Sequence, residues 1–155
     1  MGNQIKSKQR VKDFAEVFTN EREVKAMCDL IPQEVWQDIT KTFLEPACGN
    51  GAFLKEIFAR KLEYCKTEKD GLKALNSIYG IDIQQDNVDE SREMLLNMFY
   101  EKFKYASVIT IELAICIIAK RIICGDSLKI MAQWEKEINH EPIQLSFFIN
   151  KETLK

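Results

Sequence analysis

Apolar residues recur along the chain with helical spacing in some segments and form short β-rich runs in others. Helical spacing predicts helices over residues 21–31, 33–39, 53–62, 86–104 and 128–138, with Ser127 as a candidate cap for the last. Residues 106–119 fit a helix or a strand, and we predict a helix because the better strand that follows needs a crossover before it. The β-rich runs predict strands over residues 42–44, 77–83, 121–124 and 143–149.

Strands that alternate with helices predict an α/β fold with a doubly wound, mostly parallel sheet and right-handed crossovers. The length of 155 residues suits a single domain over residues 1–155. The polar and basic start of the chain leads us to expect that residues 1–12 are disordered, their Lys and Arg forming a solvated tail. In such sheets, ligands bind at the carboxyl ends of the strands.

Composition excludes several classes of protein. With 46% apolar and 30% charged residues, the chain is neither disordered nor of low complexity. Its 22 Lys and Arg against 24 Asp and Glu give a net charge of −2, so the chain alone is a poor DNA clamp. The apolar run over residues 109–119 is interrupted by Glu112 and is too short to span a bilayer.

Cysteine and histidine usage points to a cytoplasmic protein that holds no metal. The five cysteines form no Cys-x-x-Cys pair and are odd in number, which suits reduced, buried thiols. The single histidine, His140, excludes a multi-histidine metal site. The first residues lack the apolar segment of a signal peptide, and we expect no membrane association.

The first predicted strand leads into a turn of small residues, Glu45-Pro46-Ala47-Cys48-Gly49-Asn50-Gly51, which opens a helix. The backbone N–H groups of such a turn can approach an anionic group of a ligand. The dinucleotide fingerprint is incomplete, because Leu54 stands where its third glycine would be. Glu45 also disfavours a pyrophosphate, since two like charges ~4 Å apart repel by roughly 4 kcal/mol at an effective dielectric near 20.

The two following strands also end in carboxylates. Asp82 can accept hydrogen bonds from both hydroxyls of a ribose, and Asp126 can accept one from the amino group of an adenine. Glu45 suits the cationic methionyl end of S-adenosylmethionine, which carries an ammonium and a sulfonium. Three acidic strand ends therefore match a ligand with amine, ribose and adenine donors, and the predicted cofactor is S-adenosylmethionine.

These segments resemble the motifs of the S-adenosylmethionine-dependent DNA adenine methyltransferases of restriction–modification systems. The segment that resembles the first motif of this family is Thr42-Phe43-Leu44-Glu45-Pro46-Ala47-Cys48-Gly49-Asn50-Gly51-Ala52-Phe53-Leu54. The second motif is matched by Tyr79-Gly80-Ile81-Asp82-Ile83, and the third by Ile123-Cys124-Gly125-Asp126-Ser127-Leu128. Ala15-Glu16-Val17-Phe18-Thr19 is similar to an upstream motif that touches the methionyl end of the cofactor. Together the resemblance covers roughly Val11 to Met131.

The resemblance implies a Rossmann-like class I methyltransferase fold and a set of cofactor-binding residues. Glu45, Gly49 and Gly51 would surround the methionyl group, with Asp82 on the ribose and Asp126 at the adenine. The full set of cofactor-binding residues it implies is Thr19, Glu45, Pro46, Ala47, Cys48, Gly49, Gly51, Phe53, Asp82, Ile83, Asp126 and Ser127.

The sequence departs from the family in two places. Ala15 and Asn20 replace the usual glycine and proline of the upstream motif. The catalytic Asn/Asp-Pro-Pro-Tyr/Phe, which holds the flipped base, is absent, because no two of Pro32, Pro46 and Pro142 are adjacent. We therefore name no catalytic residue and expect a truncated or partner-dependent methylase, with DNA reached through a partner chain.

Other interpretations stay open at this point. The chain could be a non-catalytic binding or assembly module of a restriction–modification or phage system, a homo-oligomer or a partner subunit, with residues 145–149 as a contact strand. Further alternatives are a methyltransferase for another substrate and a nucleotide-dependent dehydrogenase. Leu54, at the place of the third fingerprint glycine, disfavours the dehydrogenase.

Several single residues also have a structural alternative. The position of Cys48 fits a packing role better than the role of a nucleophile. The position of Phe53 fits packing in the core and contact with the cofactor equally well. Trp134, Phe147 and Phe148 suit the core or an interface better than a platform for stacked bases.

Overall fold

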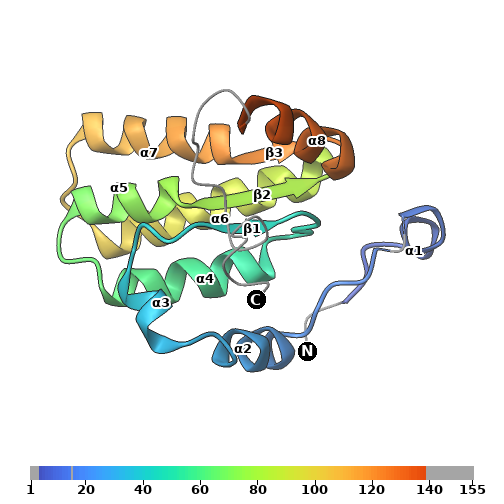
Figure 1. The fold of residues 1–155 in the computed structure, drawn as a ribbon, viewed down its shortest axis with the longest axis horizontal. Coiled ribbons are helices and arrows are strands. Elements are labelled where there is room, and N and C mark those ends of the chain that lie inside the picture. Colours follow the sequence, from blue (N-terminus) through green and yellow to red (C-terminus); the bar gives the residue numbers. More distant parts are fainter. Residues whose placement is uncertain (1–3, 15, 139–155) are drawn as a thin grey trace.

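The computed structural model describes residues 4–14 and 16–138, which form a mixed α/β fold that is mostly helical (Figure 1). The strands are β1 (Phe43–Glu45), β2 (Ile78–Asp82) and β3 (Ile122–Cys124). The helices are α1 (Lys8–Phe14), α2 (Glu21–Asp29), α3 (Gln33–Gln37), α4 (Ala52–Glu63), α5 (Glu68–Asn76), α6 (Gln85–Lys102), α7 (Val108–Arg121) and α8 (Ser127–Ile138).

The strands form one parallel sheet in the order β1-β2-β3. Leu44 pairs with Tyr79, and Ile81 pairs with Ile123. All three strands begin within one residue of the predicted positions, and the ambiguous segment before β3 is a helix, as predicted. The predicted strand over residues 143–149 lies outside the described residues.

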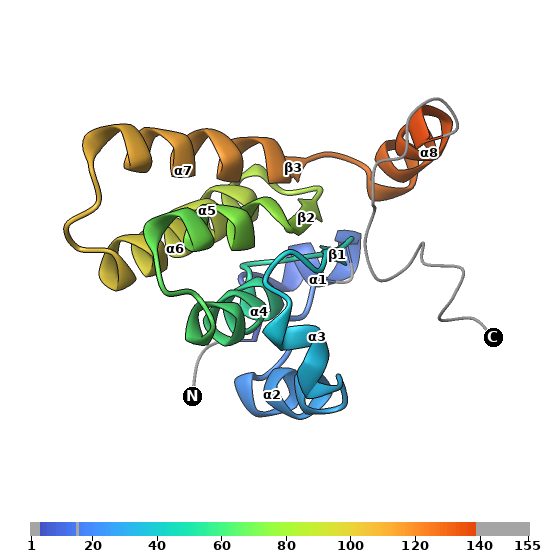
Figure 2. The ribbon, with the colours of Figure 1, turned by 60° about the vertical axis from the view of Figure 1, so that its left-hand side comes forward.

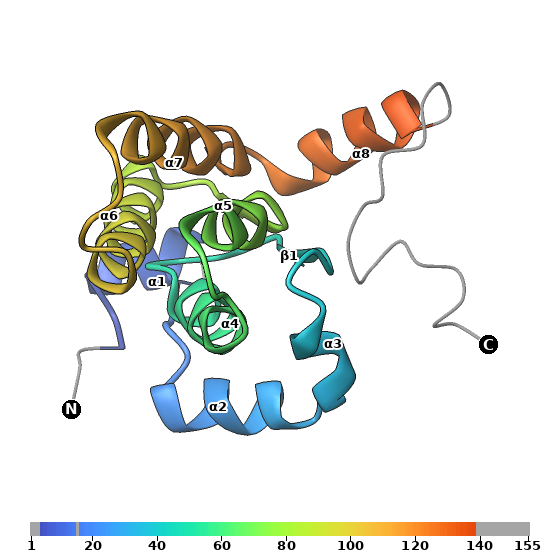
Figure 3. The ribbon, with the colours of Figure 1, turned by 90° about the vertical axis from the view of Figure 1, so that its left-hand side faces the viewer.

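Alternation along the strands gives the sheet two apolar faces. Phe43, Ile78 and Ile122 belong to the main core, to which α2 to α7 contribute. Leu44, Tyr79 and Ile81 form a second cluster, against which Ile130, Met131 and Trp134 of α8 pack. Figures 2 and 3 show α4 to α7 as one group of helices, with α8 set apart from them. Trp134 meets the Tyr79 ring edge-on at 5.9 Å, which agrees with a packing role for this tryptophan.

Helix α5 is the one element over residues 21–138 that sequence analysis missed, because residues 67–71 look like a polar linker. Thr67 and Asp70 form a capping box, in which each side chain accepts a hydrogen bond from the other residue's backbone N–H. Gly71 lets α5 approach α6 closely, since a Cβ there would lie 2.8 Å from the Phe99 ring. The Thr-x-x-Asp spacing was the available signal for this helix.

The start of the chain also differs from expectation. Residues 8–14, expected to lie in or beside a disordered tail, form α1. Lys6 and Arg10, expected to be solvated, make ion pairs with acidic residues of α6. This correction matters for function because residues 4–14 and 16–19, which we call the N-terminal strap, lie against the pocket described below.

Lys61 of α4 is completely buried. Its ammonium donates hydrogen bonds to the carbonyl oxygens of Ile39 (3.0 Å) and Lys41 (2.6 Å) and lies 5.0 Å from the centre of the Phe43 ring. Burial lowers the pKa of Lys61 to about 8, because the charged form loses its hydration. The hydrogen bonds fix the segment that leads into β1.

Three of the five cysteines are buried, namely Cys28, Cys48 and Cys65, whereas Cys116 and Cys124 are exposed. Burial raises the pKa of Cys28 and Cys65 to about 11 and that of Cys48 to about 12. These thiols stay protonated in the folded protein at pH values where an unfolded chain would lose their protons.

Stability should fall steeply above pH 9. Unfolded thiols titrate near pH ~8.5 and unfolded lysine near ~10.4, so between these values the unfolded chain loses three thiol protons that the native state keeps. Native Lys61 loses one proton that the unfolded chain keeps, so unfolding releases about two protons net. Linkage then predicts a loss of about 3 kcal/mol per pH unit between pH 9 and 10, measurable by urea unfolding.

Matched variants test the origin of this slope. Cys28→Ala should lower the number of protons released on unfolding by about one and so make the slope shallower. Cys116→Ala, at an exposed position, should leave the slope unchanged. A wild-type stability that is flat from pH 8 to 10 would contradict the prediction.

Candidate functional site

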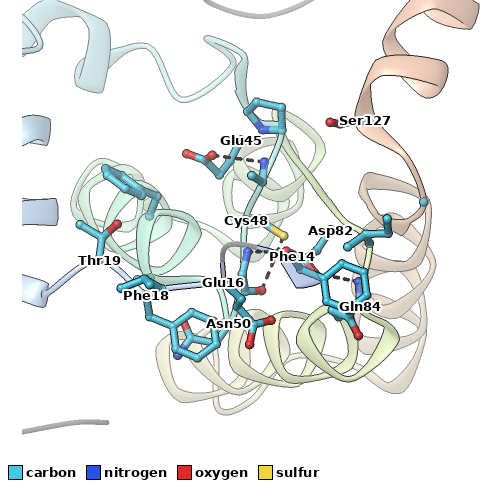
Figure 4. A pocket seen from close by; sticks show the side chains of 18 of the residues that line it. Phe14, Glu16, Phe18, Thr19, Glu45, Cys48, Asn50, Asp82, Gln84 and Ser127 are labelled. Atoms are coloured by element: carbon cyan, nitrogen blue, oxygen red, sulfur yellow. Dashed lines mark hydrogen bonds between the residues drawn. The ribbon is translucent and has the colours of Figure 1, made fainter. Parts of the chain in front are cut away.

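A pocket of about 490 Å³ lies at the carboxyl ends of the three strands. Four segments line it: the N-terminal strap, the turn after β1, the residues that end β2 and the start of α8. Figure 4 shows Glu45, Cys48, Asp82 and Thr19 around this space. The acidic ends of successive strands therefore meet in one place.

The turn after β1 requires glycine at two positions. Gly49 (φ 55°) and Gly51 (φ 90°) adopt the left-handed conformation, which strains other residues. A Cβ on Gly51 would also lie 2.8 Å from side-chain atoms of Met94 and Ser91. The Cys48 N–H donates to the Ile81 carbonyl (2.9 Å), which ties the turn to β2.

Asp82 connects the turn after β1 with the start of α6 and, through Asn87, with the strap. Its Oδ2 accepts from the Gly49 N–H (2.9 Å), and its Oδ1 accepts from the Gln84 N–H (2.8 Å) and from Asn87 Nδ2 (3.1 Å). Asn87 Nδ2 also donates to Glu16 Oε2 (2.8 Å). Asp82 is thus already bound by protein donors, and Oδ2, with a single donor, has the greater remaining capacity to accept from a ligand.

The carboxylates at the other two strand ends differ in what holds them. Glu45 is desolvated, which raises its pKa, and its Oε1 accepts a long hydrogen bond from the Ala47 N–H (3.4 Å). Asp126 Oδ1 accepts from the N–H groups of Leu128 (3.0 Å) and Lys129 (3.3 Å). Asp126 therefore caps α8, and the prediction that Ser127 does so is wrong.

The pocket is strongly acidic. Glu16, Glu45, Asp82 and Asp126 line it, and none of the described residues that line it is Lys or Arg. Among the described residues, no group of three or more His, Cys, Asp or Glu is arranged to hold a metal ion. Such a pocket favours an extended organic cation and disfavours phosphates.

Ion pairs hold the strap against α6. The Arg10 guanidinium binds Asp86 (2.7 Å) and Glu16 (2.6 Å), and the Lys6 ammonium binds Asp86 (2.9 Å) and Glu90 (2.7 Å). These cations hold the pKa of Asp86 well below its usual range. The Phe18 N–H donates to the Gln4 carbonyl (2.7 Å), which closes the strap on itself.

This junction is incompletely hydrogen-bonded. Among the described residues four buried side-chain polar atoms lack a hydrogen-bond partner, and three of them, Arg10 Nε, Glu16 Oε1 and Asn87 Oδ1, lie here. Each such atom gives up its hydration without full compensation. The strap is therefore a wall held mainly by charge, with less apolar packing than the walls formed by the sheet and α4.

Of the twelve predicted site residues, eleven line the pocket; the exception is Gly51, which shapes the turn from outside it. Phe53 lines the pocket and also packs against the core, so both of its proposed roles have support. Cys48 lines the pocket too, but it is buried and its raised pKa keeps it protonated, which favours the packing role.

Sequence analysis did not single out several other residues that line the pocket: Phe14, Glu16, Val17, Phe18, Asn50, Ala52, Gln84, Gly125 and Leu128. Three of these, Glu16, Val17 and Phe18, belong to the upstream motif, of which only Thr19 was predicted to bind the cofactor. Asn50 and Gln84 directly follow Gly49 and Ile83, two of the predicted cofactor-binding residues. His140 and the candidate contact strand over residues 145–149 lie outside the described residues.

Comparison with known proteins found no match: no family model, no curated protein and no solved structure is significantly similar to the chain. None of the helices in the described part of the chain combines the length and the apolar character that crossing a bilayer requires.

Arg10→Gln should loosen the strap. The change removes both Arg10 ion pairs and leaves the Glu16 carboxylate, whose side chain is only 9% exposed, without a cation. Loss of charge-assisted bonds at a largely buried group costs about 1–3 kcal/mol, so amide exchange in residues 4–19 should accelerate about tenfold. Hydrogen exchange read by mass spectrometry measures this.

Lys25→Gln is the matched control, because it removes an exposed ion pair with Glu21 on α2, away from the strap. Equal exchange rates in the strap of Arg10→Gln and of wild type would show that the ion pairs do not hold this wall.

Proposed function

We propose that the chain binds S-adenosylmethionine in the acidic pocket, as a Rossmann-like module of the DNA adenine methyltransferase type. The observation that supports this best is the set of three carboxylates, Glu45, Asp82 and Asp126, at or just beyond the ends of three parallel strands, in a pocket with no Lys or Arg among its described lining residues. The ligand is a cation that also offers ribose and adenine donors, so it matches both the charge and the acceptor chemistry of the pocket.

The methionyl end fits the turn after β1. The desolvated Glu45 carboxylate suits an ammonium, because a buried acid gains most from a cation that restores its charged form. Thr19 lines the same pocket from the strap and offers a hydroxyl. This end of the pocket explains why a glutamate, which would repel a pyrophosphate, precedes the glycine turn.

The ribose and adenine fit the ends of β2 and β3. Asp82 Oδ2 retains capacity to accept from a ribose hydroxyl, and Gln84 beside it adds a second polar side chain. Ile83 and Leu128 line the pocket with exposed apolar side chains (55% and 78%), which suit the two faces of an adenine ring. Asp126 is left to accept from the adenine amino group, since only its Oδ1 is used as a cap.

A dinucleotide suits the pocket less well. Leu54, at the place of the third fingerprint glycine, is fully buried in the core, so α4 does not present a glycine there. The described residues that line the pocket offer no Lys or Arg to a phosphate. Both observations disfavour the dehydrogenase hypothesis.

Methyl transfer needs a group that holds the target amine in line with the sulfonium, and the sequence lacks the Asn/Asp-Pro-Pro-Tyr/Phe motif that does so in the family. We therefore propose cofactor binding for this chain, with transfer to DNA dependent on a partner chain. The same absence supports the second candidate, a non-catalytic binding or assembly module of a restriction–modification or phage system.

Isothermal titration calorimetry tests the proposal directly. S-adenosylmethionine should bind with one site per chain, and NAD and ATP should bind much more weakly. Glu45→Gln should weaken binding tenfold or more, because a charge-assisted bond is worth about 1.5–3 kcal/mol. Glu63→Gln, at an exposed position of α4 outside the pocket, should not change the affinity. Folded wild-type protein that shows no binding would overturn the proposal.

The affinity should also depend on pH. A cation binds to ionised Glu45, and burial raises the pKa of Glu45, so its protonation begins at a higher pH than for an ordinary glutamate. Affinity should therefore decline as the pH is lowered from 7 to 5, and Glu45→Gln should remove most of this decline. Titrations at four pH values measure both slopes. Parallel slopes for the two proteins would assign the dependence to another group.

A further inference from the structure

The outer face of α7 is apolar and exposed. Val108 and Ile109 are 75% and 70% exposed, and Leu113 and Ile115 are nearly half exposed. Cys116 lies on the same face and is also exposed. None of these residues lines the acidic pocket, so this surface is independent of the proposed cofactor site.

The inner face of α7 is apolar too. Ala114 and Ile118 are buried in the main core, and the helix packs against α5 and α6. In Figure 3, α5 and α6 lie on one side of α7, and no other described helix covers the opposite side. The helix therefore carries apolar side chains on its inner face and on its outer face, and an exposed apolar patch of this kind marks an interaction surface.

The charges on this face indicate the partner. Glu112 and Lys120 are both exposed and lie four residues before and four residues after Cys116. Two copies of α7 packed antiparallel about a twofold axis near Cys116 bring Glu112 of each copy level with Lys120 of the other. A face with one charge of each sign is complementary to itself, whereas nucleic acids and anionic membranes select basic surfaces.

We propose that this chain forms a homodimer through the outer face of α7, with the two helices antiparallel and Cys116 near the twofold axis. A twofold interface uses the same patch on both subunits, so the one exposed stripe formed by Ile109, Leu113 and Cys116 is sufficient. The acidic pocket of each subunit stays outside the interface, because it lies at the carboxyl ends of the strands and α7 ends before β3.

Sedimentation velocity over a range of concentrations tests the association, with circular dichroism to verify folding of each variant. Wild type should dimerise, and Leu113→Lys should be monomeric. Glu112→Lys and Lys120→Glu should each weaken the dimer about tenfold, because symmetry repeats every attractive or repulsive pair twice. The double reversal Glu112→Lys/Lys120→Glu should restore most of the affinity, which a merely structural role of either residue would not produce.

Crosslinking tests the geometry separately. In a Cys124→Ala background, Cys116 is the one exposed thiol among the described residues, and a short bismaleimide should join two chains through it. Lys120→Glu should reduce this product. A wild type that stays monomeric, a dimer that Leu113→Lys leaves intact, or a crosslink unaffected by Lys120→Glu would each overturn the proposal. None of these outcomes depends on S-adenosylmethionine binding.

Discussion

The hydrogen bonds of the Asp82 carboxylate hold the pocket in shape. One oxygen receives the Gly49 N–H from the turn after β1, and the other receives Gln84 and Asn87 from the start of α6. Through Asn87 the same group reaches Glu16 of the strap. Three segments that are distant in sequence therefore depend on one negative charge at the end of the central strand.

The acidic character of the pocket has a physical cost that a ligand can relieve. Glu45, Asp82 and Asp126 line one cavity and repel one another, and burial raises the pKa of Glu45. A positively charged ligand reduces both penalties. The repulsion among these carboxylates belongs to the pocket itself and favours positive charge within it.

Short-range patterns allowed much of the site to be predicted from the sequence. The turn from Glu45 to Gly51 and the acids at the strand ends follow from local spacing together with the rule that parallel strands end at one edge. The resemblance placed Thr19 of the strap at the site, but the anchoring of the strap on α6 could not be predicted, because Arg10 and Asp86 are 76 residues apart and charge pairing leaves no periodic signal. The α8 cap was misassigned by one residue, since Asp126 and Ser127 are both good capping residues and only backbone geometry separates them.

The strap also affects how a ligand would enter and leave. The sheet and α4 belong to the main core, whereas the strap is anchored by salt bridges and carries two of the unpartnered buried atoms, Arg10 Nε and Glu16 Oε1. The contacts that hold the strap are therefore separate from the apolar packing that holds the sheet and α4. Added salt screens the ion pairs and leaves the apolar core intact, so the strap should loosen at salt concentrations that do not change the melting temperature.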